Sequence, residues 1–578
     1  MTPETQVIRA LNACRSLHKP TYVGLRALLD SDSDSERLAW LSQVAMRRVH
    51  ARSEWRYFSY RTLKEIETDG TPTYRECIVG SPTTLLAEAY VLSLMAREKA
   101  FATPENVYSY KWPHSDRSGR NFQYYQYGYT RRNERITEQL RENPGHVAVV
   151  ADIRRFYPSV KWTLLEPKIE NRLASVQSTS DRRAIDNFLR GLRPDSGVGI
   201  PIGTDVSHVL GNLALEDVDD RLVTKFGERY FRYVDDIIVV CPSEDRDRVV
   251  QELRSCVESV DLKMHEGKDD VVAANTWVSD CPVISRKPVS GSFERLLHDI
   301  CVYVLLWPKH LEPLQQAFAS EGFTLPFGRL VTQVKYRPYR RFARNLLRRS
   351  GWSDAMRLVF TRMTGLIEEA RSVRESLWSS LRKLASSNKP SEGMRRRWFV
   401  QQCRYNINRL LYLSSKNDYP TLLKLIPDGK EFAEYRILLG TFISGNMADI
   451  LRLPGHVLAT FCELAAEQEA PVMPKTFPDL HDRGVAESVT MLALYFGWRV
   501  PDIQTSQMYR GSKILLEVCS GGISVDNHPE EMSYLDEIEL LFRGLPQSHL
   551  AELARTRFAE GEEIGLEGLW LGGGYGVS

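Results

Sequence analysis

The chain has few of the features that mark secreted, disulfide-rich or membrane proteins. Its nine cysteines are scattered through 578 residues, with no Cys-x-x-Cys pair and no histidine at zinc-ligand spacing. No run approaches the roughly 18 consecutive apolar residues of a membrane-spanning helix. The segment Met1–Gln6 lacks a basic stretch followed by an apolar one. We therefore expect a soluble protein of a reducing cytoplasm, with no leader and no membrane contact.

An excess of either charge is also absent. The chain has 76 Lys and Arg residues against 74 Asp and Glu residues, a formal net charge of +2. Bulk charge therefore does not predict a nucleic-acid ligand, and local clusters must make that case. Hydrophobic residues make up 43% of the chain, which is enough apolar material for roughly three or four domains of ordinary size.

Two runs of aromatic and β-branched residues meet at Val234-Asp235-Asp236, inside the stretch Arg229–Val240. This composition predicts a strand, a tight turn and a second strand. Adjacent acids are poor strand formers and are costly to bury unpaired. On these residues alone two interpretations stay open: a turn that uses Asp for its local hydrogen bonding, or a site for a divalent cation.

A third acid, Asp152, ends the apolar run that begins at His146, and we expect it at the exposed end of a buried strand. Nucleotidyl transfer uses two Mg²⁺ ions about 3.5–4 Å apart, and carboxylates from two strands can hold them. Mg²⁺ takes few protein ligands and keeps waters, so two or three acids suffice. We predict Asp152, Asp235 and Asp236 as catalytic and metal-binding residues for two Mg²⁺ ions, for which Mn²⁺ can substitute.

Four motifs in order carry a family resemblance. Asp152 is followed by the loop Gly199-Ile-Pro201-Ile-Gly203, then Tyr233-Val-Asp-Asp236, then Leu262–Lys268. This arrangement resembles the reverse transcriptases, in which Tyr-x-Asp-Asp is the catalytic hairpin. The resemblance implies an α+β right-hand polymerase with an antiparallel palm sheet. It also implies an RNA-directed DNA polymerase, a nucleotidyltransferase that uses dNTPs. Residues 1–70 would form a helical N-terminal part of the fingers, and residues 71–290 the fingers and palm.

The resemblance also implies roles for single residues. Asp152 and Asp235 would bind both metals, while Asp236 shapes the hairpin and its local charge. Tyr157 resembles the steric gate that crowds a ribose 2′-hydroxyl, although a core aromatic beside Phe156 is an equal alternative. The further nucleotide-binding candidates are Arg75 in the fingers, Gly203 in the loop, and Lys268, which could equally be a solvated surface lysine.

Beyond about residue 290 the chain consists of Leu- and Arg-rich segments of helical period. We expect a basic thumb-like or linker region over 291–385, a break at 385–393, and an all-α, repeat-like domain over 386–578 that ends in a Gly-rich tail. The run Lys335–Arg349 contains no acid, and Met394–Trp398 is a smaller basic run. We predict nucleic-acid contacts from Arg337, Arg340, Arg341 and Arg344, the alternative being a solvated helix face.

Two departures from the family pattern narrow the resemblance. Ile202 stands where enzymes that copy RNA usually have Gln, and Asp205 stands where a small residue or proline is more common. With the long helical C-terminal part, these features resemble the bacterial abortive-infection and other defence-associated reverse transcriptases. Retron and group II intron enzymes are the nearest alternatives. A non-catalytic polymerase fold that binds RNA as a scaffold is a further one.

The defence-associated resemblance implies a set of partners and a mode of priming. It implies DNA synthesis against phage, RNA-directed or template-independent, with a non-coding RNA as template or scaffold. It also implies a homo-oligomer or a partner reverse transcriptase. Priming on a tyrosine hydroxyl would need a residue that reaches the metals. Tyr575 in the Gly-rich tail meets this need by flexibility, and the aromatic cluster Tyr108–Tyr129 by location.

Overall fold

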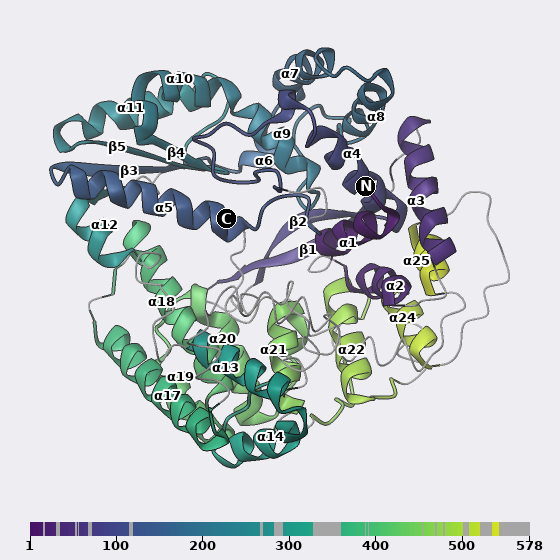
Figure 1. Cartoon of the computed structure of the whole chain (residues 1–578), viewed down its shortest axis with the longest axis vertical. Coiled ribbons are helices and arrows are strands. Elements are labelled where there is room, and N and C mark those ends of the chain that lie inside the picture. Colours follow the sequence, from purple (N-terminus) through teal and green to yellow (C-terminus); the bar gives the residue numbers. More distant parts are fainter. Residues whose placement is uncertain are drawn as a thin grey trace.

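The computed structural model describes most of the chain. The described residues are 1–14, 18–30, 35–51, 55, 57–67, 72–114, 119–265, 270–281, 293–327, 360–387, 389–390, 392–453, 455–466, 468, 471–477, 480–500, 508–520 and 534–542. They build two bodies, each around a large hydrophobic core (Figure 1).

The first body opens with three helices, α1 (Pro3–Cys14), α2 (Lys19–Asp30) and α3 (Ser35–His50). They are followed by an antiparallel hairpin of β1 (Tyr57–Ile66) and β2 (Pro72–Gly80), and then by α4 (Pro82–Met95). The expectation of helix throughout residues 1–70 is therefore wrong for β1. Strand β1 forms because its partner β2 supplies a matching ladder over nearly its whole length, a long-range pairing that outweighs local helical period.

The palm sheet has four strands in the order β4-β5-β3-β6, and every neighbouring pair is antiparallel. Its strands are β3 (His146–Asp152), β4 (Tyr230–Tyr233), β5 (Asp236–Pro242) and β6 (Asp270–Ala273). The predicted strand, turn and strand around Val234 are thus confirmed as β4, a turn and β5. The antiparallel palm sheet is confirmed as well.

The two faces of this sheet are covered by different helices, because alternate residues of a strand point to opposite faces. Val147, Val149 and Ala151 belong to the core shared with α10 (Glu216–Phe226) and α11 (Arg246–Glu258). Ala148 and Val150 face α5 (Tyr125–Glu142) and α12 (Ala274–Asp280). Figure 1 shows the strands between these two helical layers.

Four more helices complete the first body around the sheet. They are α6 (Phe156–Ser159), α7 (Trp162–Ala174), α8 (Thr179–Arg190) and α9 (Val206–Ala214). Helix α9 follows the Gly199–Gly203 loop.

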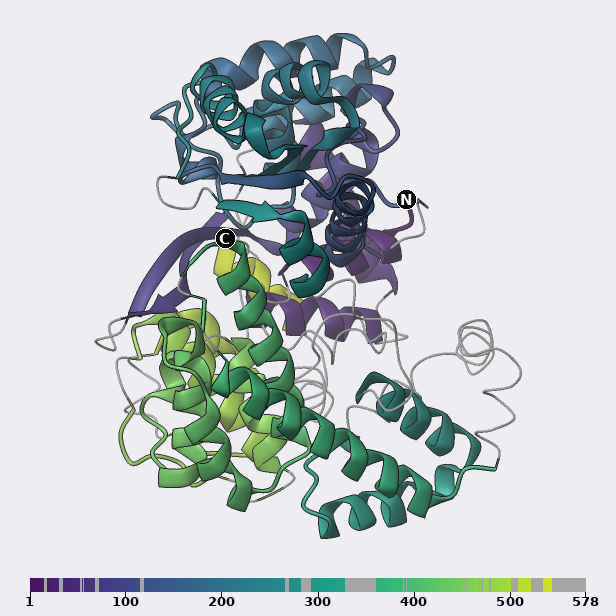
Figure 2. The same cartoon turned by 90° about the vertical axis from the view of Figure 1, so that its left-hand side faces the viewer.

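The second body is all-α in its described residues and lies beside the first (Figure 2). Its helices are α13 (Phe293–Leu306), α14 (Leu311–Ser320), α17 (Met363–Ser386), α18 (Gly393–Tyr412), α19 (Tyr419–Leu425), α20 (Ala433–Ser444), α21 (Gly455–Ala466) and α22 (Arg483–Phe496). The boundary expected at 385–393 does not separate two cores, because α17 and α18 on either side of it pack against each other in one core. A repeat architecture stays a prediction.

The last described helices return to the first body. In α24 (Arg510–Ser520) and α25 (Tyr534–Phe542), Leu515 and Ile538 are buried in the N-terminal core, so residues 386–578 are not a single separate domain. Figure 1 shows both helices beside α2 and α3. Glu537 of α25 accepts hydrogen bonds from the Thr83 amide at 3.1 Å and from Arg48 at 3.0 Å. None of the described helices combines the length and the apolarity that a membrane crossing requires.

Candidate functional site

The three predicted acids come together at one end of two neighbouring strands. Asp152, the last residue of β3, lies directly opposite Asp236, the first residue of β5. Residues opposite each other in an antiparallel pair have Cβ atoms about 4.5–5.5 Å apart. The Ile153 amide donates to the Asp235 carbonyl at 3.3 Å, which holds the turn against the end of β3. Asp152 is only 3% exposed and Asp235 only 8%.

The turn between β4 and β5 has an unusual backbone. Val234 has φ 57°, a left-handed conformation that β-branched residues rarely adopt and that persists only where the surroundings enforce it. Its amide donates to Ser109 Oγ at 2.9 Å, and its carbonyl accepts from Arg232 Nη1 at 3.0 Å. These contacts fix the direction in which Asp235 and Asp236 leave the turn.

A buried ion pair lies beneath this turn. Arg232 Nε and Nη2 donate to the two carboxylate oxygens of Asp219 at 2.7 and 2.6 Å. The two side chains are 0% and 3% exposed, and the Tyr230 hydroxyl donates to the same carboxylate. Because a buried charge is costly without its partner, this network holds β4 firmly on α10.

The glycine loop joins the hairpin β1–β2. The Ile78 amide donates to the Ile202 carbonyl at 2.7 Å. Gly203 has φ 110°, and a Cβ there would lie 2.3 Å from the Ile78 carbonyl oxygen, so the close approach requires glycine. Arg75 lies three positions before Ile78 on β2 and is half-buried. The nucleotide contacts of Gly203 and Arg75 stay predictions.

Tyr157 lies between the loop and the acids. Its carbonyl accepts from the Ile200 amide at 2.8 Å, and its hydroxyl is 2.8 Å from His208 Nδ1 on α9. Burial, with a further contribution from the charge of Asp235, raises the pKa of Tyr157. Phe156 is buried in the core, whereas the Tyr157 side chain is half-buried. The structure thus places the predicted gate beside a predicted metal ligand.

Two carboxyl groups lie at the start of α9. Glu88 of α4 is 2% exposed and accepts from the Val206 amide at 2.8 Å. Burial, and then the neighbouring Asp205, raise the pKa of Glu88 to about 8. Burial also raises the pKa of Asp205, whose carboxylate accepts from Asn121 Nδ2 at 2.7 Å. The departure at Asp205 is therefore part of a buried polar contact under the loop.

A residue that the sequence did not single out reaches the site from the second body. Arg397 Nη1 on α18 is 3.0 Å from Asp236 Oδ1. Burial works against the charged guanidinium, but Asp236, and then Asp152, outweigh it and raise the pKa of Arg397. Its only signal in the sequence is membership of the basic run Met394–Trp398.

The other two arginines of that run also pair with acids. Arg395 Nε lies 3.3 Å from Asp280 Oδ2 of α12, and Arg396 Nε lies 3.0 Å from Glu431 Oε1. The sequence left this run open between a nucleic-acid contact and a solvated helix face. The structure instead gives each of its arginines an intramolecular carboxylate partner.

Several predicted residues fall outside the part of the chain that the structure describes. They are Lys268, the basic residues Arg337, Arg340, Arg341 and Arg344, and Tyr575. Their roles stay predictions.

The carboxylates fit a hard divalent cation that is shared with a substrate. Among the described residues, no group of three or more His, Cys, Asp or Glu side chains is gathered to hold a metal ion by itself. Asp236 is paired with Arg397, and the assignment of Asp152 and Asp235 as the metal ligands stays a prediction. Two carboxylates suit Mg²⁺, because its shell is completed by waters and substrate phosphates.

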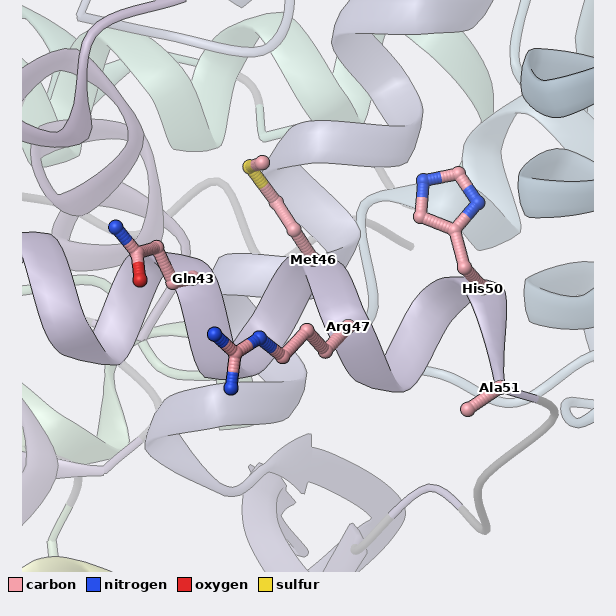
Figure 3. A pocket seen from close by; sticks show the side chains of 5 residues that line it. All are labelled: Gln43, Met46, Arg47, His50 and Ala51. Atoms are coloured by element: carbon pink, nitrogen blue, oxygen red, sulfur yellow. The ribbon is translucent and has the colours of Figure 1, made fainter.

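The described part of the protein has two notable hollows. One, of about 320 Å³, lies behind the glycine loop and is lined by Tyr57, Ile78, Gly191, Leu192, Pro194, Val198, Gly199, Ile200 and Pro201. The other, of about 540 Å³, is open and shallow and lies along α3. Figure 3 shows Met46 and His50 on one side of this helix. None of the predicted site residues lines the second hollow.

The sheet is antiparallel, has acids at adjacent strand ends and lies next to a glycine loop and a helix, an arrangement that suits metal-assisted nucleotidyl transfer. Residues 110–289 match the family model described as reverse transcriptase (RNA-dependent DNA polymerase). This part of the chain is therefore similar to a reverse transcriptase domain.

Two further comparisons were made with whole proteins. Mediator of RNA polymerase II transcription subunit 14 of Caenorhabditis elegans is 26% identical over 166 residues, which cover 26% of this chain. The match spans only 11% of that relative's length. A solved structure of telomerase from Candida albicans, in complex with a TWJ fragment of telomeric RNA, is 11% identical. The match covers 70% of this chain and 68% of the telomerase chain, with a TM-score of 0.27.

Proposed function

We propose that this protein is a Mg²⁺-dependent DNA polymerase of the reverse transcriptase kind, which adds deoxynucleotides to a growing 3′ end. One observation carries the proposal. Asp152 and the Asp235 turn meet at adjacent strand ends, and Tyr157 lies near enough for the charge of Asp235 to help raise its pKa. Carboxylates in this setting suit nucleotidyl transfer, in which the protein contributes chiefly positioning and charge.

Each side chain has a definite task in this proposal. Asp152 and Asp235 hold two Mg²⁺ ions, which when bound activate the attacking 3′-oxygen and neutralise the triphosphate. Mn²⁺ can take their place. The Tyr157 ring crowds a ribose 2′-hydroxyl and so favours dNTPs. Arg75 and Lys268 contact the phosphates as charged donors.

We further propose a role in defence against phage by abortive infection, in a bacterial cytoplasm. The support is the resemblance carried by Ile202 and Asp205 together with the large helical body. The Ile202 side chain packs against the core, and the Ile202 carbonyl accepts a hydrogen bond from the Ile78 amide of β2. The proposed partners are a non-coding RNA and a second copy of this chain or another reverse transcriptase.

Priming on a tyrosine hydroxyl extends the proposal. Tyr575 is one candidate. The Tyr108–Tyr129 cluster is the other, and Tyr129 packs edge-on against Tyr233 of the catalytic hairpin with ring centroids 5.7 Å apart. Protein purified after synthesis should carry nucleotides on a tyrosine, which mass spectrometry of its peptides would find. Peptides free of nucleotide after an active reaction would rule out this mode of priming.

Incorporation of each labelled dNTP, with and without added RNA, tests the function. We expect Mg²⁺-dependent incorporation by the full-length protein, and the response to RNA separates templated from untemplated synthesis. A retron-like or group II intron-like enzyme would require its RNA and copy it. A protein that binds RNA tightly yet incorporates no nucleotide under any of these conditions would be a scaffold, which would refute the enzymatic proposal.

A further inference from the structure

The face of the palm sheet that carries Asp152 and Asp236 is the face that α18 covers. Because side chains alternate along a strand, Asp152 shares a face with Ala148 and Val150, and Asp236 shares it with Ile238 and Val240. These apolar neighbours form one cluster with Met394 and Trp398 of α18. The second body thus reaches the catalytic side of the sheet.

Helix α18 is anchored there by contacts on both sides of Arg397. Trp398 is 2% exposed, and its ring meets that of Trp277 of α12 edge-on, with centroids 5.1 Å apart. At the start of the helix, the Met394 amide donates to Asp270 Oδ2 on β6 at 2.6 Å. Two anchors four positions apart leave little freedom in where the Arg397 side chain begins.

Arg397 is the arginine of its run whose charge lies next to the predicted acids, because the other two arginines pair with other carboxylates. The neighbouring cations Arg395 and Arg396 pair with Asp280 and Glu431. Arg397 pairs with Asp236, and the two side chains are 33% and 16% exposed. A cation this close to the acids lowers the local negative charge and fixes one carboxylate of the set.

The two sides of the acid group are therefore distinct. The charge of Asp235 contributes to the raised pKa of Tyr157 and of Tyr110, which lie on the side of the glycine loop. The charges of Asp236 and Asp152 act on Arg397, on the side of α18. Asp152 is linked to both groups, because it lies opposite Asp236 and the amide of the next residue, Ile153, donates to the Asp235 carbonyl.

We propose that Arg397 is a positioning residue of the polymerase site, contributed by the helical body. It holds Asp236 away from the metals, so that Asp152 and Asp235 bind them with the charge that catalysis requires. This inference rests on the proposed polymerase function. It also makes activity depend on the docking of α18, so the second body is a functional part of the site.

Binding of Mn²⁺ to the full-length protein, measured by electron paramagnetic resonance, tests the inference without any nucleotide. Arg397→Gln removes a cation beside the acids and releases Asp236. We expect it to bind Mn²⁺ more tightly, by at least about threefold, because the electrostatic repulsion is gone. In the same variant kcat should fall by about 10- to 100-fold with little change in KM, as for other residues that orient metal ligands.

Three further variants separate this role from a structural one. Arg397→Lys keeps the charge and should restore most of kcat and the Mn²⁺ affinity. Arg395→Gln breaks a more exposed pair on the same helix and should leave both quantities unchanged. In an Asp236→Asn background, Arg397→Gln should have little further effect on kcat, because the carboxylate through which it acts is absent.

The outcomes are distinguishable. Unchanged Mn²⁺ affinity in Arg397→Gln, a raised kcat, or equal effects of Arg395→Gln would overturn the inference. So would additive effects of the Arg397 and Asp236 changes. If the unaltered protein incorporates no nucleotide under any condition, the proposed function fails, and the Mn²⁺ measurement still decides whether Arg397 acts on the acid group.

Discussion

Single side chains near the acids are held in defined protonation states by burial. His208 lies under Tyr110, with ring centroids 3.5 Å apart and planes 7° apart. Burial lowers the pKa of His208 to about 3, so the imidazole is neutral at physiological pH. A neutral ring accepts at Nδ1 when its other nitrogen carries the proton, and it can then take the Tyr157 hydroxyl hydrogen bond. The position of Tyr157, the predicted gate, thus depends on its hydrogen bond with His208.

Tyr157→Ala should weaken the preference for deoxynucleotides. Without the ring, nothing crowds the 2′-hydroxyl, so the ratio of kcat/KM for dGTP to that for GTP should fall by about tenfold or more. Tyr157→Phe is the control, because it keeps the ring and loses only the bond to His208. An alanine variant that selects dGTP as strongly as the unaltered protein would show that Tyr157 is a core residue and not a gate.

Glu88 gives the stability of the protein a dependence on pH. Its pKa is about 8 in the folded protein, against 4.5 as the ordinary value. Between these values the folded state keeps a proton that the unfolded state has released, so stability falls as the pH rises. Glu88→Gln stays neutral and can still accept from Val206. Its melting temperature relative to the unaltered protein should therefore rise between pH 6 and about pH 8. A constant difference over that range would contradict the assigned shift.

Among the elements, the hairpin of β4 and β5 is held by the most extensive buried contacts described for the site. Its turn contains the left-handed Val234, and Arg232 supports it from below through both Val234 and Asp219. The element therefore resists small displacements of Asp235. Rigid support of this kind suits a site in which the metal ligands need fixed positions.

Arg232→Met should destabilise the protein by about 3–5 kcal/mol, because it leaves the Asp219 carboxylate buried without its ion-pair partner. Urea unfolding would measure the change. Lys225→Met breaks the exposed pair between Lys225 and Glu252 and should cost less than about 1 kcal/mol. Equal effects of the two substitutions would mean that the buried pair does not support the hairpin as described.

Sequence reasoning predicted the elements whose signals are local. The apolar run that ends at Asp152, the strands around Val234 and the glycine loop all carry strong patterns, and all were found. Strand β1 was missed because its pairing with β2 is not visible in its own residues. Arg397 was missed because its partner Asp236 lies 161 positions away, and a run of arginines does not reveal which acid each one meets.

For the molecule as a whole, the two bodies are joined at several points. Helix α18 covers the face of the sheet that carries Asp152 and Asp236. Helix α25 contacts the first body, where Glu537 accepts a hydrogen bond from the Thr83 amide. The expected division into successive domains along the chain therefore does not hold, because the last described helices complete the first core. Motion of the helical body relative to the palm would change the surroundings of Asp236 directly.

The most direct test of the account is the rate of deoxynucleotide incorporation by Asp235→Asn and Asp152→Asn, beside Asp220→Asn as the control. Asp220 is an exposed acid on α10, so its variant should work at the unaltered rate. Loss of a metal ligand removes several kcal/mol of charge stabilisation, so the two site variants should be slower by about 10³-fold or more, with unchanged melting temperatures. Incorporation by folded Asp235→Asn at the rate of the unaltered protein would contradict the account.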